Sequence, residues 1–155
     1  MSAVIHGFRM EPEVKKQVKG NDVFFTIVWS SFMKADKFII NASVPAMAGI
    51  FELYYLDEKK KLNLISMQRV WYGGLRSRLR MVTDPELVED PKRKQLLSTH
   101  TCYFRYSLIN SSEDMADIMF FFASNRPVAA GCAKPSGRYT TVFVKELSQD
   151  KLVTI

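Results

Sequence analysis

Residues 44–82 constrain the fold more than any other stretch of the chain. Two runs rich in aromatic and aliphatic residues, 49–56 and 62–67, flank the polar segment 57–61, which has the length of a loop that joins antiparallel strands. Two consecutive glycines then interrupt the pattern, and apolar residues recur at helical spacing from Gly74 onward. The stretch therefore predicts a hairpin followed by a short helix.

Three further runs, 22–30, 101–109 and 138–146, carry the β-branched and aromatic residues of strands. Ser111 or Ser112 then caps a helix whose apolar residues fall at i, i+3, i+4 and i+7. This mixture predicts an α+β fold, with a small antiparallel or mixed sheet of about five to six strands flanked by short helices.

Weaker signals complete the prediction. A proline favours a short helix over residues 13–20 that a glycine ends. The apolar run 37–42 predicts a second short strand beside 22–30, and an internal proline divides 86–98 into two helical pieces. The segment 125–137 contains two prolines and two glycines and predicts a long loop, of the kind that often carries function.

The composition is that of a soluble globular protein, with 47% hydrophobic and 25% charged residues. A length of 155 residues predicts a single domain over residues 1–155. The sequence has no run of about 18 apolar residues that could span a bilayer, and residues 1–10 carry no readable secretory signal. We therefore expect no membrane partner and a cytoplasmic location.

The two cysteines, Cys102 and Cys132, are too few for a disulfide framework and predict reduced, buried thiols. A zinc site would need them to converge with His6 and His100, but the sequence lacks the closely spaced ligand pairs of structural zinc sites. These residues therefore predict neither a metal site nor a cofactor.

The formal net charge is +6, and four arginines with no acid among them lie in and around the predicted helix. They are Arg69, Arg76, Arg78 and Arg80. Such a local excess of positive charge is typical of proteins that bind nucleic acid or another polyanion. In the alternative interpretation these arginines pair with the acids that follow them, Asp84, Glu86, Glu89 and Asp90.

Aromatic residues offer a second kind of surface. Phe120, Phe121 and Phe122 widen the apolar face of their helix beyond one stripe, so the helix is either sandwiched or exposes aromatic surface. Protein interfaces are enriched in aromatic residues, methionine and arginine. A protein-interaction or structural role would therefore use Trp71, Phe120, Phe121 or the loop 125–137.

The order of these elements resembles the GIY-YIG endonuclease domain over about residues 44–123. The strand beginning Gly49-Ile50-Phe51, the charged turn, the second strand and the arginine-bearing helix follow the order of that domain, and the strand 101–109 with its following helix matches the later part. The resemblance implies a GIY-YIG-like core with N-terminal and C-terminal strand additions. It also implies cleavage of nucleic acid, in which tyrosines activate water, a helix arginine stabilises the phosphate and a glutamate binds Mg²⁺.

Several positions depart from the catalytic pattern of that family. Phe51 stands where a tyrosine is expected, and the second strand lacks its tyrosine and glycine. Phe120 lies near the position of the glutamate, and a phenylalanine cannot bind magnesium. The sequence therefore favours a domain without catalysis.

Residual nuclease activity would depend on displaced groups. Arg78 matches the family's arginine. Tyr54, Tyr55 or Tyr72 could supply a hydroxyl, and Asp117 could supply a carboxylate for Mg²⁺ nearly one helical turn early. This is the third hypothesis, after polyanion binding by the arginines and a protein-interaction role. The sequence favours the first, a non-catalytic basic α+β domain that binds nucleic acid or another polyanion.

Overall fold

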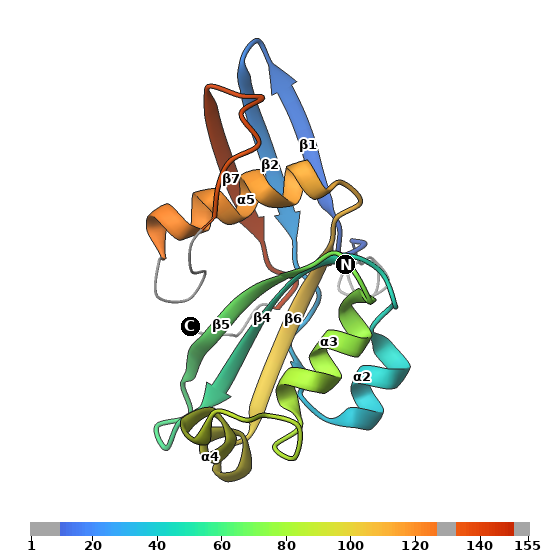
Figure 1. Cartoon of the computed structure of the whole chain (residues 1–155), viewed down its shortest axis with the longest axis vertical. Helices are drawn as coiled ribbons and strands as arrows, with labels where there is room; N and C mark the ends of the chain where they lie inside the picture. The colour runs from blue at the N-terminus through green and yellow to red at the C-terminus, as the bar shows by residue number, and fades with distance from the viewer. Residues whose placement is uncertain (1–9, 127–132, 151–155) are drawn as a thin grey trace, which may run out of the picture.

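The described part of the chain, residues 10–126 and 133–150 of a computed structural model, forms two β-sheets and four helices (Figure 1). The first sheet has the order β1-β2-β7 and contains β1 (Val14–Lys19), β2 (Asp22–Val28) and β7 (Thr141–Leu147). The second has the order β3-β6-β4-β5 and contains β3 (Met33–Lys34), β4 (Gly49–Leu56), β5 (Leu62–Val70) and β6 (Cys102–Leu108). The helices are α2 (Lys37–Ser43), α3 (Gly74–Thr83), α4 (Pro91–Thr99) and α5 (Ser112–Asn125).

The predicted α+β class is confirmed, but the strands form two sheets rather than one sheet of about five to six strands. In the first sheet β2 pairs antiparallel with β1 and parallel with β7. In the second, β4 pairs antiparallel with both β5 and β6. The chain passes between the sheets just after β2, where Ser30 N donates to Tyr106 O at 2.8 Å and Ser107 Oγ donates to Val28 O at 2.9 Å.

Two local predictions are wrong. Residues 13–20, expected to be helical, contain β1, because pairing with β2 supplies hydrogen bonds to this segment. Residues 37–42, expected to be a strand, lie in α2, because Asp36 caps the helix. Its carboxylate accepts hydrogen bonds from Phe38 N at 2.8 Å and Ile39 N at 3.3 Å.

The segment 86–98, predicted to hold two helical pieces, contains one helix. Asp90 caps α4 by accepting a hydrogen bond from Arg93 N at 2.8 Å, and Pro91 occupies the first turn, where no N–H is needed. Before it the chain makes only a turn, in which Leu87 N donates to Asp84 O at 3.0 Å.

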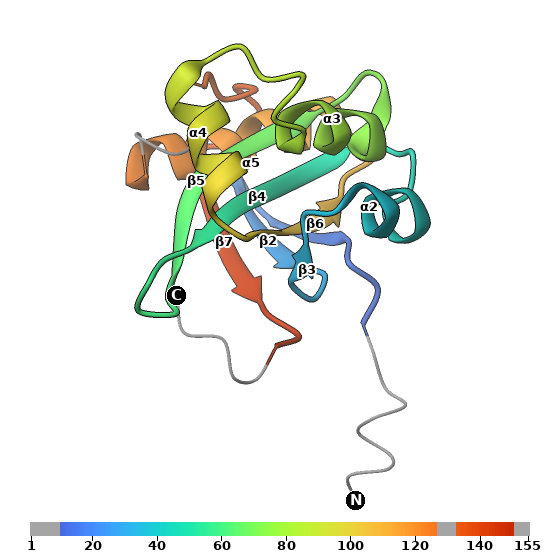
Figure 2. The ribbon, with the colours of Figure 1, turned by 90° about the horizontal axis from the view of Figure 1, so that it is seen from below.

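β4 lies between two hydrophobic cores, because its side chains alternate between the faces of the sheet. Phe51 and Leu53 belong to the core that α2 and α3 cover. Ile50 belongs to the core between the two sheets and α5. Figure 2 shows α2, α3 and α4 on one side of the four-stranded sheet and the strands β2 and β7 on the other.

Two glycines let the start of α3 lie close to its neighbours. A Cβ atom at Gly49 would meet the backbone oxygen of Ser107 and would lie 2.7 Å from Leu75 Cδ1. A Cβ atom at Gly74, where φ is 81°, would lie 2.8 Å from the carbonyl carbon of Ala46. The packing of α3 against β4 therefore requires both glycines.

Replacing Gly49 by alanine is expected to lower the free energy of unfolding by roughly 1–3 kcal/mol, because the added methyl group meets backbone that cannot move away cheaply. Urea denaturation followed by fluorescence measures the change. Gly20→Ala is the comparison, since that glycine has φ +59° but open space around it. A loss for Gly49→Ala no greater than for Gly20→Ala would contradict the steric argument.

Candidate functional site

The connection between β5 and α3 places two aromatic side chains at the surface. Trp71 is 40% exposed and Tyr72 is 86% exposed. Gly73 and Gly74 follow, both with φ 81°, in the left-handed region that glycine adopts without strain. This tight turn starts α3 directly after the two exposed aromatic residues.

An open pocket of about 450 Å³ lies beside these aromatic residues, and we call it the basic pocket. Its lining comes from β5, the β5–α3 connection, α3 and the start of α5: Arg69, Trp71, Tyr72, Arg78, Ser112 and Met115. None of the described residues that line it is acidic, so its arginines set the sign of the local potential. The basic pocket therefore favours an anionic ligand.

Among the described residues, the two arginines of the basic pocket have no carboxylate partner. Arg69 is exposed on β5, and Arg78 is half-buried on α3. Within residues 10–126 and 133–150, neither guanidinium forms an ion pair with an acidic side chain. Each guanidinium offers donors that match a phosphate group.

The other two arginines of the predicted cluster lie on the α2 side of α3. Arg76 Nε donates to the backbone oxygen of Val44 at 2.7 Å, and Arg80 Nη1 donates to Asn41 Oδ1 at 3.1 Å. In the described part of the chain, no ion pair joins any of the four arginines to the acids that follow α3. The structure thus brings two of the four predicted residues to one site and separates the others from it.

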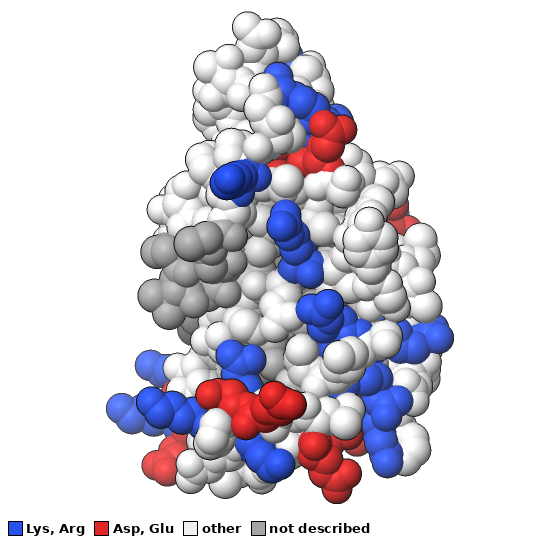
Figure 3. Space-filling model, in the orientation of Figure 1, with Lys and Arg blue, Asp and Glu red and all other residues white. Residues whose placement is uncertain are grey.

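Figure 3 shows the charge on the face where β5, α3 and α5 are visible. Lys and Arg side chains follow one another from the three-stranded sheet down toward α3, mostly with uncharged atoms between them. Acidic side chains lie near α4 and where α5 crosses the three-stranded sheet. The elements that line the basic pocket therefore lie on a face with many positive side chains.

The tyrosines and the arginine predicted for a residual nuclease do not all lie in one pocket. Tyr72 and Arg78 line the basic pocket. Tyr55 lies near the opposite end of β4 from Gly49, where its ring packs edge to face against His100 at 5.1 Å. Tyr54 is buried, and its hydroxyl donates to Glu52. Of these candidates, only Tyr72 and Arg78 therefore lie at one site.

Asp117, the displaced carboxylate of the nuclease hypothesis, is 1% exposed and fully engaged within the fold. It accepts hydrogen bonds from Ser136 N at 2.7 Å, Ser136 Oγ at 2.8 Å and Arg138 Nη2 at 2.9 Å. These bonds hold one end of the predicted loop 125–137 on α5, whereas residues 127–132 lie outside the described residues. Across the described chain, no three His, Cys, Asp or Glu side chains form a group that could hold a metal ion.

The aromatic residues predicted to form one partner surface lie in different parts of the structure. Trp71 lines the basic pocket. Phe120 is 37% exposed on α5, whereas Phe121 packs against the core and lies edge to face with Phe122 at 5.6 Å. A protein partner on α5 would therefore contact Phe120 rather than Phe121.

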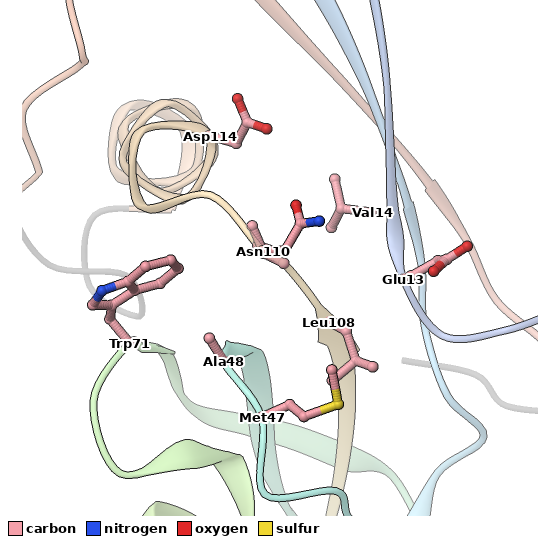
Figure 4. A pocket seen from close by; sticks show the side chains of 9 residues that line it. Glu13, Val14, Met47, Ala48, Trp71, Leu108, Asn110 and Asp114 are labelled. Carbon is pink, nitrogen blue, oxygen red and sulfur yellow. The ribbon is translucent and has the colours of Figure 1, made fainter.

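A second pocket, of about 420 Å³, shares Trp71 with the basic pocket (Figure 4). Its walls include Val14 of β1, Met47 before β4, Leu108 of β6 and Asn110 before α5. We call it the Asn110 pocket. No sequence pattern indicated this pocket, because its residues come from four separate parts of the chain.

An ionic network around Glu52 was also not predicted from the sequence. Glu52 is 0% exposed, yet its carboxylate is fully hydrogen-bonded. Its Oε1 accepts from Arg105 Nε at 2.7 Å and from Tyr54 Oη at 2.9 Å, and its Oε2 accepts from Arg126 Nη1 at 2.9 Å. Burial, with the nearby charge of Glu52, raises the pKa of Tyr54 above its ordinary value.

Glu146 of β7 extends this network to the three-stranded sheet. It accepts hydrogen bonds from Trp29 Nε1 at 2.8 Å and Arg126 Nη2 at 3.3 Å. The guanidinium of Arg105 lies 4.7 Å from the centre of the Trp29 ring. The network therefore joins both sheets to the end of α5, and its role is structural.

Cys102 is a buried free thiol, as the sequence predicts. Burial raises the pKa of Cys102 to about 11, so the thiol is protonated at neutral pH. Cys132 and His6 lie outside the described residues.

These features define an α+β domain with a surface pocket lined by arginine and aromatic side chains. A family model described as "Uncharacterised protein" matches residues 13–155, and the chain belongs to that family. No curated protein and no solved structure gives a significant match to the chain. Among the described helices, none is long and apolar enough to cross a membrane.

Proposed function

We propose that this chain binds single-stranded nucleic acid through the basic pocket, without cleaving it. One observation carries the proposal. Arg69 and Arg78, which have no carboxylate partner among the described residues, line one pocket together with the exposed rings of Trp71 and Tyr72. Sites for single strands combine these two kinds of side chain.

The two kinds of side chain have different tasks. The guanidinium groups of Arg69 and Arg78 bind backbone phosphate by charge-assisted hydrogen bonds. The rings of Trp71 and Tyr72 stack on bases, and each such stack is worth about 1–3 kcal/mol. Bases in a duplex are already stacked on one another, so this arrangement favours a single strand.

The resemblance to the GIY-YIG domain is still a prediction, and it is compatible with the proposed binding of nucleic acid. The elements β4, β5, α3, β6 and α5 follow in the order on which the resemblance rests. In that family the helix arginine contacts phosphate, and Arg78 of α3 lines the basic pocket here. Phe51 is buried and has no hydroxyl, and Asp117 is engaged by its own neighbours, which supports binding without cleavage.

A protein-interaction role is the alternative. It rests on Phe120, since Trp71 belongs to the basic pocket and Phe121 packs against the core. A stable protein interface buries about 800 Å² on each partner, and one exposed ring is a small part of that. Nucleic-acid binding therefore has the stronger support.

Fluorescence anisotropy with labelled single-stranded and double-stranded oligonucleotides tests the proposal. We expect the single strand to bind more tightly than the duplex. Its affinity should fall between about 50 and 200 mM salt, with a slope of log K against log salt of about −0.7 for each phosphate contact. The strand should stay intact on a gel after incubation with Mg²⁺. The absence of any binding at low salt would falsify the proposal.

A further inference from the structure

The Asn110 pocket differs in chemistry from the basic pocket beside it. Its walls are mainly apolar and include Val14, Met47, Leu108 and the indole of Trp71. Its volume of about 420 Å³ is in the range of small-ligand sites. A pocket with these walls suits a planar, largely apolar group.

Two carboxylates lie at the edge of the Asn110 pocket. Asp114 Oδ1 accepts hydrogen bonds from Lys16 Nζ at 3.1 Å and from Arg138 Nη2 at 2.9 Å. In Figure 4 the carboxylates of Asp114 and Glu13 both point away from Trp71. They leave the space beside the indole free. None of the described residues that line this pocket is a lysine or an arginine, so it offers a phosphate no cationic donor. An anionic group therefore belongs in the basic pocket and an uncharged group in the Asn110 pocket.

Asn110 supplies the polar group that such a ligand would meet. Figure 4 shows its amide directed toward Val14, across the space that separates α5 from β1. Asn110 is exposed, so its amide is open to a ligand or to water. The amide offers two N–H donors and one carbonyl acceptor, a set that pairs with the edge of a nucleobase.

We propose that the Asn110 pocket holds one base of the bound strand while Arg69 and Arg78 bind the neighbouring phosphate. This inference rests on the proposed function. Trp71 lines both pockets, so a base stacked on its indole lies directly beside the arginines. Asn110 hydrogen-bonds to the edge of that base, and Met47 closes the apolar wall.

Anisotropy with the full chain tests this inference, using a labelled single strand and an abasic strand of the same length and charge. The normal chain should bind the strand that carries bases more tightly. Asn110→Ala should weaken binding to that strand about 3- to 10-fold, as expected for one or two lost hydrogen bonds, and should leave the abasic strand unaffected. Asn21→Ala, an exposed asparagine between β1 and β2, should change neither affinity.

The outcomes separate the two proposals. If neither strand binds at low salt, both the proposed function and this inference are overturned. If the two strands bind equally, or if Asn110→Ala weakens both to the same degree, phosphate binding stands and the base pocket is overturned. Equal losses for Asn110→Ala and Asn21→Ala on the base-carrying strand would also overturn it.

Discussion

Replacing Glu52 by alanine is expected to lower the free energy of unfolding by about 3–5 kcal/mol. The change leaves Arg105, whose side chain is 7% exposed, without its nearest carboxylate at 2.7 Å. Arg126 Nη1 and the Tyr54 hydroxyl lose their acceptor as well, and Arg126 keeps only its bond to Glu146 at 3.3 Å. Among the described carboxylates, Arg105 then keeps only the more distant Glu146, at 3.8 Å. Removing one partner of a buried ion pair is costly, and total stabilities are only about 5–15 kcal/mol, so this single change removes a large part of the stability.

Urea denaturation followed by tryptophan fluorescence measures this loss. Glu52→Gln is the milder variant, because it removes the negative charge but keeps an amide oxygen that accepts from Tyr54. If Glu52→Ala does not fold, Glu52→Gln provides the measurement. Glu58→Ala is the matched control, since Glu58 is exposed in the β4–β5 turn and should matter by less than about 0.5 kcal/mol. Variants of Glu52 that lose no more than this control would show that the network contributes nothing to stability.

The double variant Arg69→Ala/Arg78→Ala is expected to bind a single strand about 10- to 100-fold more weakly than the normal chain. Both guanidinium groups that face the basic pocket are removed, and with them two phosphate contacts. The slope of log K against log salt should therefore become shallower by about 1.4, which is the value for two contacts to single-stranded nucleic acid. Anisotropy titrations at several salt concentrations give both quantities.

The control for this variant removes the same charge elsewhere. Lys59→Ala/Lys61→Ala changes two exposed lysines in the turn between β4 and β5. Its affinity should fall far less, because the turn does not line the basic pocket. Equal losses in the two double variants would mean that net charge, rather than the pocket, governs binding.

Local sequence patterns predicted most helices and strands. They failed for β1 and α2, where strand pairing or a helix cap determined the secondary structure. The hairpin of β4 and β5, the helix α3 and the Ser111 cap of α5 follow from alternation, helical spacing and cap chemistry. The lysines, valines and glutamine of β1 do not alternate strictly and lack strong strand signals, and β1 forms because β2 pairs with it. In α2 the apolar run suggested a strand, whereas Asp36 before it was the helix signal.

The candidate site was predictable in part. Helical spacing on α3 already places Arg78 on the other side of the apolar stripe from Arg76 and Arg80, and the structure separates them in that way. The pairing of Glu52 with Arg105 could not be predicted, because the two residues are 53 positions apart and lie on different strands. Such contacts depend on the register of the sheet, which no local pattern specifies.

The parallel pairing of β2 with β7 has a consequence for the nascent chain. The ribosome makes β2 before β7, so Trp29, the residue after β2, has no Glu146 to bind until 117 more residues have been added. Until β7 emerges, one edge of β2 has no partner, and the core residues Val23, Phe25 and Ile27 lack part of their cover. Unpaired strand edges are where growing chains aggregate. The apolar residues and the unpaired edge of β2 are therefore most exposed to aggregation between the synthesis of β2 and that of β7.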